Sequence, residues 1–328
     1  SVQAMAEGEF NKQAVAELFL QMMTLSRRYQ YQTIAGRVGG PDLGFHKVEK
    51  LETAGKRVVF QGLEGAYGHA AALQFFGKDA DIHHVRRFED MMVEIQEGKA
   101  DFAVLPIENS TEGIVTDIYD LLTEYQLYIV GEQGMKVEHV LLGILGTSLE
   151  EIKTVYSHPQ ALAQCKKYLE SHPDWKAVKT ENTAGAAKKI HEELDRTQAA
   201  IASRAAGELY GLSVMAENIC YNEENVTRFI IVSAHPVYEK SAAKISVSFE
   251  LPHESGTLYH MLSHFIYNGL SMTKIESRPI TGKKWEYRFF VDFEGNLEEP
   301  AVKNALRGLE AEANRMRVLG NYGQQEEE

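Results

Sequence analysis

Short apolar runs alternate with amphipathic stretches through the middle of the chain. The apolar runs have the length and composition of strands and cover Arg57–Phe60, Phe102–Leu105, Leu127–Val130, Val140–Leu145, Thr154–Tyr156, Ala199–Ile201 and Phe229–Val232. Helical spacing fits the residues near 68–77, 88–97, 115–125, 159–171, 183–195 and 203–210. This alternation predicts an α/β domain over residues 56–233 with a mainly parallel sheet. A segment of this length suits two lobes around a cleft.

A different pattern follows the polar stretch at residues 234–243. In order, it predicts a strand at 244–251, a helix at 255–268, a strand at 271–280, a turn, a strand at 285–293, a helix at 298–314 and a strand at 317–319. The order βαββαβ is the ferredoxin-like plan. We therefore expect a separate domain over residues 244–320.

The N-terminal part has a third pattern. Apolar residues such as Val15, Leu18 and Met22 recur every three or four positions, which predicts one helix over residues 10–36. Asn11 is suited to begin this helix and Gly36 to end it. The helix belongs to a segment of residues 1–37, and the glycine-rich stretch that follows predicts a linker at 38–55.

Composition narrows the classes of function. The formal net charge is −13, which disfavours nucleic acid as a partner and means that an anionic ligand needs a local set of donors. No apolar run is long enough for a membrane span, and no secretion signal is evident. The cysteines are Cys165 and Cys220, a usage that fits a reducing compartment. We expect a cytoplasmic protein that does not bind a membrane, in which Cys165 is a core residue.

Three segments lie where a predicted strand passes into a helix, the usual position of ligands in α/β folds. They are Gly62–Gly68, Pro106–Gly113 and Ser157–Gln160, the last with Gln164 in the next helix. A fourth segment, Asn225–Phe229, precedes a very apolar strand. The glycines permit close approach of a ligand to the backbone, and the other segments offer hydroxyl, amide, carboxyl and guanidinium groups. Each segment also has a purely structural interpretation as a tight turn, a helix cap or a surface ion pair.

Other chemistries have weaker support. His260 and His264 have the spacing of a zinc pair on a helix, but Met261 stands where a metalloprotease needs Glu, so no metal is expected. The spacing of the glycines at 62–68 differs from the dinucleotide-binding pattern.

Taken in order, the four segments resemble the signatures of the prephenate dehydratase family. The family has a glycine-rich first turn, a P-I-E-N-S/T-x-x-G loop, an S-H-P-Q turn and a T-R-F triplet, the last present here as Thr227–Phe229. The sequence departs from it at Leu63, where Pro is frequent, and at Gly68, where Ser is frequent. The resemblance implies conversion of prephenate into phenylpyruvate, without a cofactor, in a two-lobed domain similar to periplasmic binding proteins.

The resemblance also implies roles for individual residues. The catalytic set that it implies is Thr227, Glu108, Asn109, Ser157 and Gln164, and the substrate-binding set is Ser110, Arg228, Phe229, Gly65, Ala66 and Tyr67. Thr227 is the hydroxyl near the leaving group. Thr227 is itself a weak acid, so Glu108 is an alternative proton donor if burial raises its pKa. Arg228 is interpreted either as a clamp for a carboxylate or as a structural residue.

The last domain resembles an ACT domain, which implies regulation by L-phenylalanine. The effector-binding residues would be Gly256, Thr257, Leu258, Glu276, Ser277, Arg278 and Pro279, with Thr257 in place of the usual Ala. We expect feedback inhibition through ACT domains paired in a homodimer or homotetramer.

The N-terminal helix resembles the last helix of a chorismate mutase domain, with Ser26 and Gln30 at substrate-contact positions. The cationic residues of the earlier mutase helices are missing, so no mutase activity is expected from this chain. Two other functions remain open. One is a non-catalytic binding protein or sensor with a two-lobed cleft, and the other is a nucleotide-dependent oxidoreductase.

Overall fold

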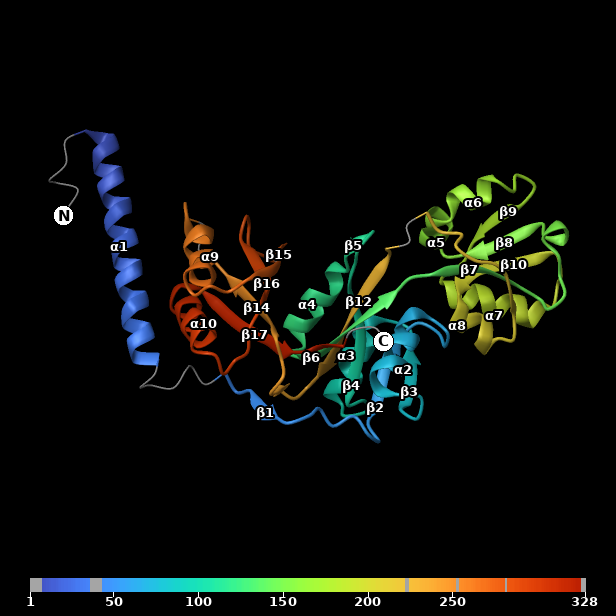
Figure 1. Cartoon of the computed structure of the whole chain (residues 1–328), viewed down its shortest axis with the longest axis horizontal. Helices are drawn as coiled ribbons and strands as arrows, with labels where there is room; N and C mark the ends of the chain where they lie inside the picture. The colour runs from blue at the N-terminus through green and yellow to red at the C-terminus, as the bar shows by residue number, and fades with distance from the viewer. Residues whose placement is uncertain (1–7, 36–42, 222–223, 252–253, 281, 326–328) are drawn as a thin grey trace. The chain divides into compact units, whose positions relative to one another are not determined.

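The computed structural model describes residues 8–35, 43–221, 224–251, 254–280 and 282–325. The chain divides into two compact units. The central unit comprises residues 48–239 and 322–328, and the C-terminal unit comprises residues 1–47 and 240–321. Figure 1 labels the elements of both units. Within the described ranges, no helix is long and apolar enough to cross a membrane.

The first lobe of the central unit is built on a mixed sheet. Its strands lie in the order β6 (Tyr128–Lys136), β12 (Val226–Ser233), β4 (Phe102–Asn109), β2 (Arg57–Gln61) and β3 (Asp81–Val85). Three helices pack against it, α2 (Tyr67–Phe76), α3 (Phe88–Gln96) and α4 (Thr116–Glu124). On the α2 side, buried Phe60, Ala72, Val104 and Ile231 form the core. Alternate residues of these strands therefore face α2. The C-terminal end of β2 leads through a short turn to the N-terminus of α2.

The second lobe repeats this plan with a five-stranded sheet. The order is β11 (Ser213–Ala216), β7 (His139–Gly143), β10 (Gln198–Ser203), β8 (Thr154–Ser157) and β9 (Lys176–Lys179). Figure 1 shows α5 (Pro159–Gln164) and α6 (Lys166–Glu170) on one side of the sheet, and α7 (Thr183–Glu193) and α8 (Arg204–Leu209) on the other. A 3-10 turn, η2, covers Leu149–Glu151. Each face has its own apolar cluster, one of which contains the fully buried Cys165.

The two lobes are joined by two passages of the chain. The chain leaves the first lobe through β6 and enters the second through β7, and it returns from β11 to β12. The strands at these passages pair antiparallel with their neighbours, whereas β2–β3, β2–β4, β8–β9 and β8–β10 are parallel. The expectation of a mainly parallel sheet was therefore wrong. A strand that arrives from the other lobe needs no helical crossover, and a buried apolar run does not encode its own direction.

Short strands complete the pairing. In the central unit, β5 (Gly113–Ile114) pairs with β4, and β18 (Gln324–Gln325) pairs with β6. Two further short strands are β1 (His46–Val48) and β13 (Val237–Glu239).

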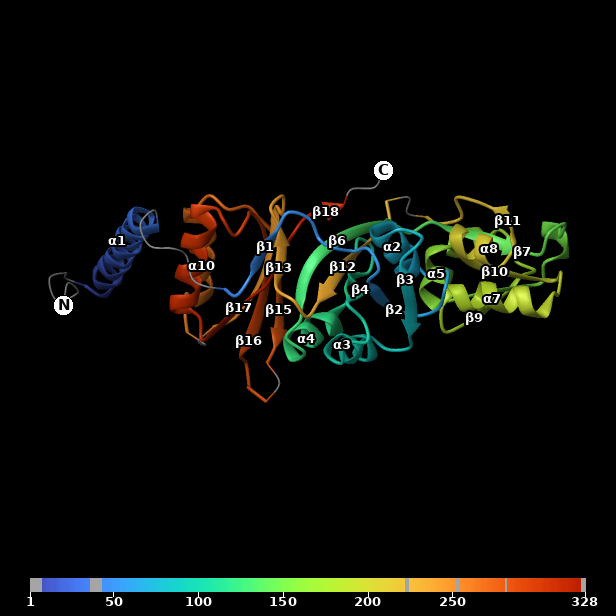
Figure 2. The same cartoon turned by 90° about the horizontal axis from the view of Figure 1, so that it is seen from below.

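The C-terminal unit has the predicted βαββαβ order. It contains β14 (Lys244–Glu250), α9 (Thr257–Tyr267), β15 (Met272–Pro279), β16 (Tyr287–Glu294), α10 (Pro300–Glu312) and β17 (Arg315–Tyr322), with strand order β15-β16-β14-β17. Figure 2 shows α10 along one face of these strands. The N-terminal helix α1 covers Glu9–Ala35, so that helix prediction is confirmed. The expected helix end at Gly36 and part of the predicted linker lie outside the described residues.

Candidate active site

A cavity of about 540 Å³ in the central unit is lined by segments of both lobes. Five of the lining segments are the beginnings of helices. They are Ala66–Gly68 at α2, Phe88 at α3, Val115 at α4, His158 and Gln160 at α5, and Asn182 and Thr183 at α7. A helix N-terminus carries unsatisfied N–H groups and a partial positive charge. The cavity is therefore suited to an anionic ligand.

Charged side chains contribute little to this cavity. Glu181 is the one carboxylate among the described residues that line it, and no Lys or Arg lines it in the same described set. An anion bound here would be held mainly by neutral donors and helix termini.

Asn109 and Thr227 form the centre of the polar lining. Asn109 ends β4 and Thr227 lies near the start of β12, at paired positions of the two strands. The Asn109 Nδ2 atom donates to Thr227 Oγ1 at 2.8 Å and to Asn225 Oδ1 at 2.7 Å. Asn109 Oδ1 in turn accepts from the backbone N–H groups of Thr111 and Glu112. The amide is thus fixed, and it fixes the Thr227 hydroxyl.

Glu108 and Arg228 are neighbours of these residues in sequence but are not among the residues that line the cavity. Arg228 Nη2 lies 3.3 Å from Glu108 Oε2, and Arg228 Nη1 lies 2.9 Å from Oε2 of the buried Glu132. The pairing of β12 with β4 shifts by one residue between Arg228 and Phe229. The extra residue lies in β4 between Pro106 and Glu108, so Pro106 and Asn109 both line the cavity although they are three positions apart. Thr227 and Phe229 line it through the ordinary alternation of β12.

Gln164 belongs to a hydrogen-bonded chain that links the lobes. Its Oε1 atom lies 3.2 Å from His139 Nε2, and its Nε2 atom donates to Glu112 Oε1 at 3.4 Å. His139 Nδ1 lies 3.1 Å from the hydroxyl of Tyr67, which also donates to the backbone carbonyl of Glu138. A neutral His139 protonated at Nε2 donates to Gln164 Oε1, and its Nδ1 then shares the single hydroxyl proton of Tyr67 with the Glu138 carbonyl.

Burial keeps the His139 and Tyr67 side chains of this hydrogen-bonded network neutral. Desolvation lowers the pKa of His139 to about 4. Burial, and next the charges of Cys220 and Cys165, raise the pKa of Tyr67 well above its usual value. Near neutral pH, His139 is therefore unprotonated at one nitrogen and Tyr67 keeps its proton. Both residues orient Gln164 and Glu138 through neutral hydrogen bonds.

The two predicted serines make backbone contacts. Ser157, fully buried at the end of β8, donates to the carbonyl of Ile201 at 2.5 Å. The Ser110 hydroxyl donates to the carbonyl of Glu224 and accepts from the N–H of Val226. Neither serine is among the lining residues. The hydrogen bonds of Ser110 instead connect the start of β12 to the loop after β4.

The glycine-rich turn lies against the cavity. Gly65 has a φ of +86°, and a Cβ atom there would lie 3.1 Å from the Cα of Ala206, so Gly is required for the close approach of the two lobes. The Gly65 carbonyl accepts from the hydroxyl of Ser203. Ala66, Tyr67 and Gly68 then line the cavity at the first turn of α2.

Several lining residues had no sequence signal that we recognised. They include Gln61, His139, Asn182 and Thr183. His139 is a buried polar residue at the start of the run His-Val-Leu-Leu-Gly, and its polarity in an apolar strand was the available clue. Asn182 caps α7 by accepting from the N–H of Gly185. It reads in sequence as an ordinary helix cap.

The predicted effector residues lie at one end of the sheet in the C-terminal unit. Glu250 is paired with Arg288, and Arg288 with Arg278, so the C-terminal ends of β14 and β15 share that edge. Gly256, with a φ of +85°, precedes α9 directly after β14. The two predicted effector segments therefore occupy the same end of the sheet.

Comparison with known proteins agrees with these observations. A family model for prephenate dehydratase matches residues 58–237. The bifunctional chorismate mutase/prephenate dehydratase of Enterobacter agglomerans is 37% identical over 271 residues, which cover 81% of this chain and 70% of the relative. Prephenate dehydratase from Arthrobacter aurescens, solved in complex with L-phenylalanine, has a TM-score of 0.75 with 33% identity, covering 81% of this chain and 89% of that one.

A solved structure called GqqA, described as a novel type of quorum-quenching acylase, has a TM-score of 0.76 with 32% identity, covering 82% of this chain and 98% of that one. Acylase activity differs from prephenate dehydration, so the family is assigned from the match over residues 58–237 and from the Enterobacter agglomerans relative. The chain belongs to the prephenate dehydratase family and is a prephenate dehydratase of phenylalanine biosynthesis.

Proposed function

We propose that the cavity between the two lobes catalyses the decarboxylating dehydration of prephenate to phenylpyruvate, with Thr227, Asn109 and Gln164 as the principal side-chain donors. The observation that carries this assignment is the meeting of five helix N-termini with these three side chains in one cavity. Prephenate is a dianion, and loss of its carboxylate and hydroxyl groups produces an aromatic ring. Aromatisation supplies the driving force, so the enzyme's task is to orient the dianion and assist the departing hydroxide.

Recognition of the dianion is assigned to neutral groups. The starts of α2, α3, α4, α5 and α7 are the lining parts that favour negative charge. Because the chain has a net charge of −13, this local arrangement is what overcomes the overall repulsion of an anion. A carboxylate in contact with helix termini also avoids the desolvation that a buried cation would require.

Assistance to the departing hydroxide is assigned to Thr227. Its Oγ1 accepts a hydrogen bond from Asn109 Nδ2, an arrangement that leaves the hydroxyl proton for donation to the substrate. The Asn109 dipole polarises the Thr227 O–H bond and supports partial proton transfer. Glu108 faces Arg228, so it is assigned to orient Arg228 and the strand pair, and Arg228 is assigned to hold Glu132.

Gln164 is assigned to hold the second lobe against the first around the substrate. Its hydrogen bonds to His139 and Glu112 come from opposite lobes. Ser157 and Ser110 support the ends of β8 and β12 through their backbone contacts. Gly65, Ala66 and Tyr67 shape the wall at α2, and Phe229 supplies an apolar surface for the ring of the substrate.

Regulation is assigned to the C-terminal unit, residues 244–320. The start of α9 places Thr257 and Leu258 beside Gly256, and β15 places Glu276, Ser277, Arg278 and Pro279 at the same sheet end. An amino acid needs both an anion site and a cation site, which a helix N-terminus and a carboxylate provide. Because β15 is the terminal strand in the sheet order, its outer edge is open to a second copy, which supports a homodimer or homotetramer.

Two further assignments concern location and the N-terminal helix. The enzyme is assigned to the cytoplasm, and residues 1–37 are assigned no chorismate mutase activity. Ser26 and Gln30 are both exposed on α1, and one helix does not enclose a substrate.

The decisive experiment measures phenylpyruvate formed from prephenate by the purified chain, with and without L-phenylalanine. Activity that falls on addition of phenylalanine supports both assignments. Activity that is insensitive to phenylalanine keeps the enzyme and removes the regulator. A folded protein that binds prephenate without converting it would instead be a non-catalytic binding protein.

A further inference from the structure

Cys165 and Cys220 are in contact next to the active cavity, since Cys165 directly follows the lining residue Gln164. Their Sγ atoms lie 3.5 Å apart, although Cys165 follows α5 and Cys220 lies between β11 and β12. The backbone N–H of Tyr221 donates to the carbonyl of Gln164 at 3.1 Å, so the two segments are also joined next to the sulfurs. The sulfurs of a disulfide are about 2.05 Å apart, a closure that needs about 1.5 Å of approach.

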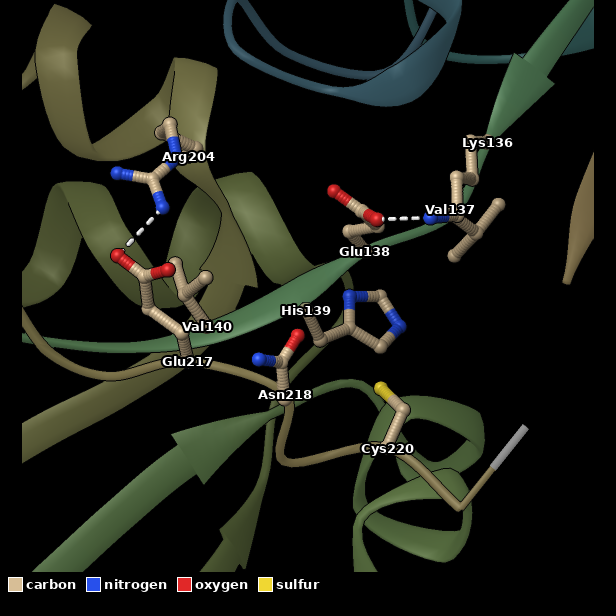
Figure 3. Close-up of a pocket in the computed structure, with 9 residues that line it drawn as sticks. All are labelled: Lys136, Val137, Glu138, His139, Val140, Arg204, Glu217, Asn218 and Cys220. Carbon is tan, nitrogen blue, oxygen red and sulfur yellow. Dashed lines mark ion pairs between the residues drawn. The ribbon is translucent and has the colours of Figure 1, made fainter. Parts of the chain in front are cut away.

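Access to this pair comes from one side only. Cys165 is fully buried, whereas Cys220 is partly exposed and lines a second cavity of about 210 Å³. Figure 3 shows the Cys220 sulfur pointing toward His139 within that cavity. The cavity is flanked by the ion pairs Arg204–Glu217 and Lys136–Glu138. A small polar oxidant therefore has a route to Cys220 but not directly to Cys165.

The electrostatics give the two thiols different roles. The neighbouring Cys165 thiol, and then the backbone N–H of His139, lower the pKa of Cys220 to about 7. The same contact and burial raise the pKa of Cys165. Glu138, His139 and the phenol of Tyr67 are also close to this pair. Near neutral pH, Cys220 is the thiolate that reacts first, and Cys165 is positioned as the resolving thiol.

We propose that Cys165 and Cys220 form a reversible intramolecular disulfide in response to hydrogen peroxide, and that this bond lowers prephenate dehydratase turnover. The Cys220 thiolate attacks one peroxide oxygen, which yields a sulfenic acid and hydroxide. Cys165 then attacks the sulfenic sulfur and releases water. In total, two thiols and one hydrogen peroxide give one disulfide and two waters.

The effect on turnover follows from what each cysteine adjoins. Cys165 is bonded to Gln164, and Cys220 lies on the return passage that leads into β12 and Thr227. Drawing the sulfurs together shifts both donors relative to the substrate and ties this passage to the second lobe. Because a displacement of about 1 Å in an active site can cost up to about a hundredfold, we expect turnover to fall by about tenfold. This expectation rests on the proposed roles of Gln164 and Thr227, whereas bond formation does not.

The test treats the reduced full chain with hydrogen peroxide and follows thiols and activity separately. Intact mass should fall by two hydrogens, free thiols titrated in denaturant should disappear, and a peptide map without reductant should contain one cross-link between the Cys165 and Cys220 peptides. Turnover should fall about tenfold and recover with dithiothreitol. Cys220→Ser, a change at a partly exposed position, should retain its basal activity and lose no turnover at the same peroxide dose.

Specific results would overturn the proposal. A stable sulfinic acid on Cys220, or cross-links only between chains, would exclude the intramolecular bond. A complete disulfide with unchanged turnover would exclude its effect on catalysis. Equal loss of activity in the wild type and in Cys220→Ser would place the oxidation damage elsewhere.

Discussion

Thr227 and Arg228, adjacent at the start of β12, lie on opposite faces of the strand and in different electrostatic surroundings. Thr227 faces the cavity beside Asn109, where an anion is handled by neutral donors. Arg228, the next residue, pairs instead with Glu108 and the buried Glu132. One face is therefore proposed to carry the chemistry, and the other holds an ion-pair network, although both derive from one short motif. The comparison teaches that adjacent residues of the T-R-F triplet have different surroundings, which assigns the hydroxyl to the reaction and the guanidinium to the fold as proposals to be tested.

The largest effect is expected at Thr227. Thr227→Ala should lower kcat by about 10²–10⁴, because the hydroxyl that assists hydroxide departure is lost. Thr227→Ser is the matched control and should stay within about tenfold of the wild type, since it keeps the hydroxyl. Steady-state formation of phenylpyruvate measures both. Near wild-type kcat in a folded Thr227→Ala variant would remove Thr227 from the mechanism.

The second effect concerns stability on the opposite face. Arg228→Met should lower the free energy of unfolding by about 3–5 kcal/mol, because Glu132, which is 1% exposed, loses its cationic partner. Denaturant unfolding measures this change. Arg228→Lys keeps a charge and should alter the KM for prephenate by no more than about twofold. A tenfold rise in KM, with stability retained, would instead make Arg228 the clamp for a substrate carboxylate.

A smaller effect is expected in the pH dependence of stability, through His139 in the hydrogen-bonded network of the cavity. Burial lowers the pKa of His139 to about 4 from an ordinary value near 6.5. As the pH falls from about 6.5 to 4, the unfolded chain binds a proton that the folded chain does not, so stability decreases with decreasing pH. Over that window His139 should account for about 3 kcal/mol.

Denaturant unfolding of the wild type and of His139→Gln at pH 7 and pH 4.5 tests this. The wild type should lose about 2–3 kcal/mol more than the variant on acidification. The comparison between the two proteins cancels the titration of shared carboxylates. An identical pH dependence in both proteins would mean that His139 is protonated within the fold.

The contrast between the two faces also marks what the sequence could predict. Most strands and helices of the central unit, and the βαββαβ order of the C-terminal unit, follow from hydrophobic periodicity. The directions of Glu108 and Asn109 do not, because the extra residue of a bulge in β4, opposite Arg228 and Phe229, shifts the alternation. His139 was missed because an apolar strand conceals a single polar position. The edge strand β9 was also missed, because its sequence Lys-Ala-Val-Lys contains no apolar run.

The smallest effect is expected in the C-terminal unit, where charge is proposed to serve binding and not catalysis. Arg278→Ala should raise the concentration of L-phenylalanine needed for half inhibition by about fivefold, the lower end of typical allosteric coupling. Lys274→Ala removes the same charge from the same strand, but away from the sheet end shared with α9, so its response should match the wild type. Inhibition curves at fixed prephenate compare the variants. Equal shifts in both variants would attribute the effect to net charge on β15, and no shift in Arg278→Ala would remove that residue from the effector site.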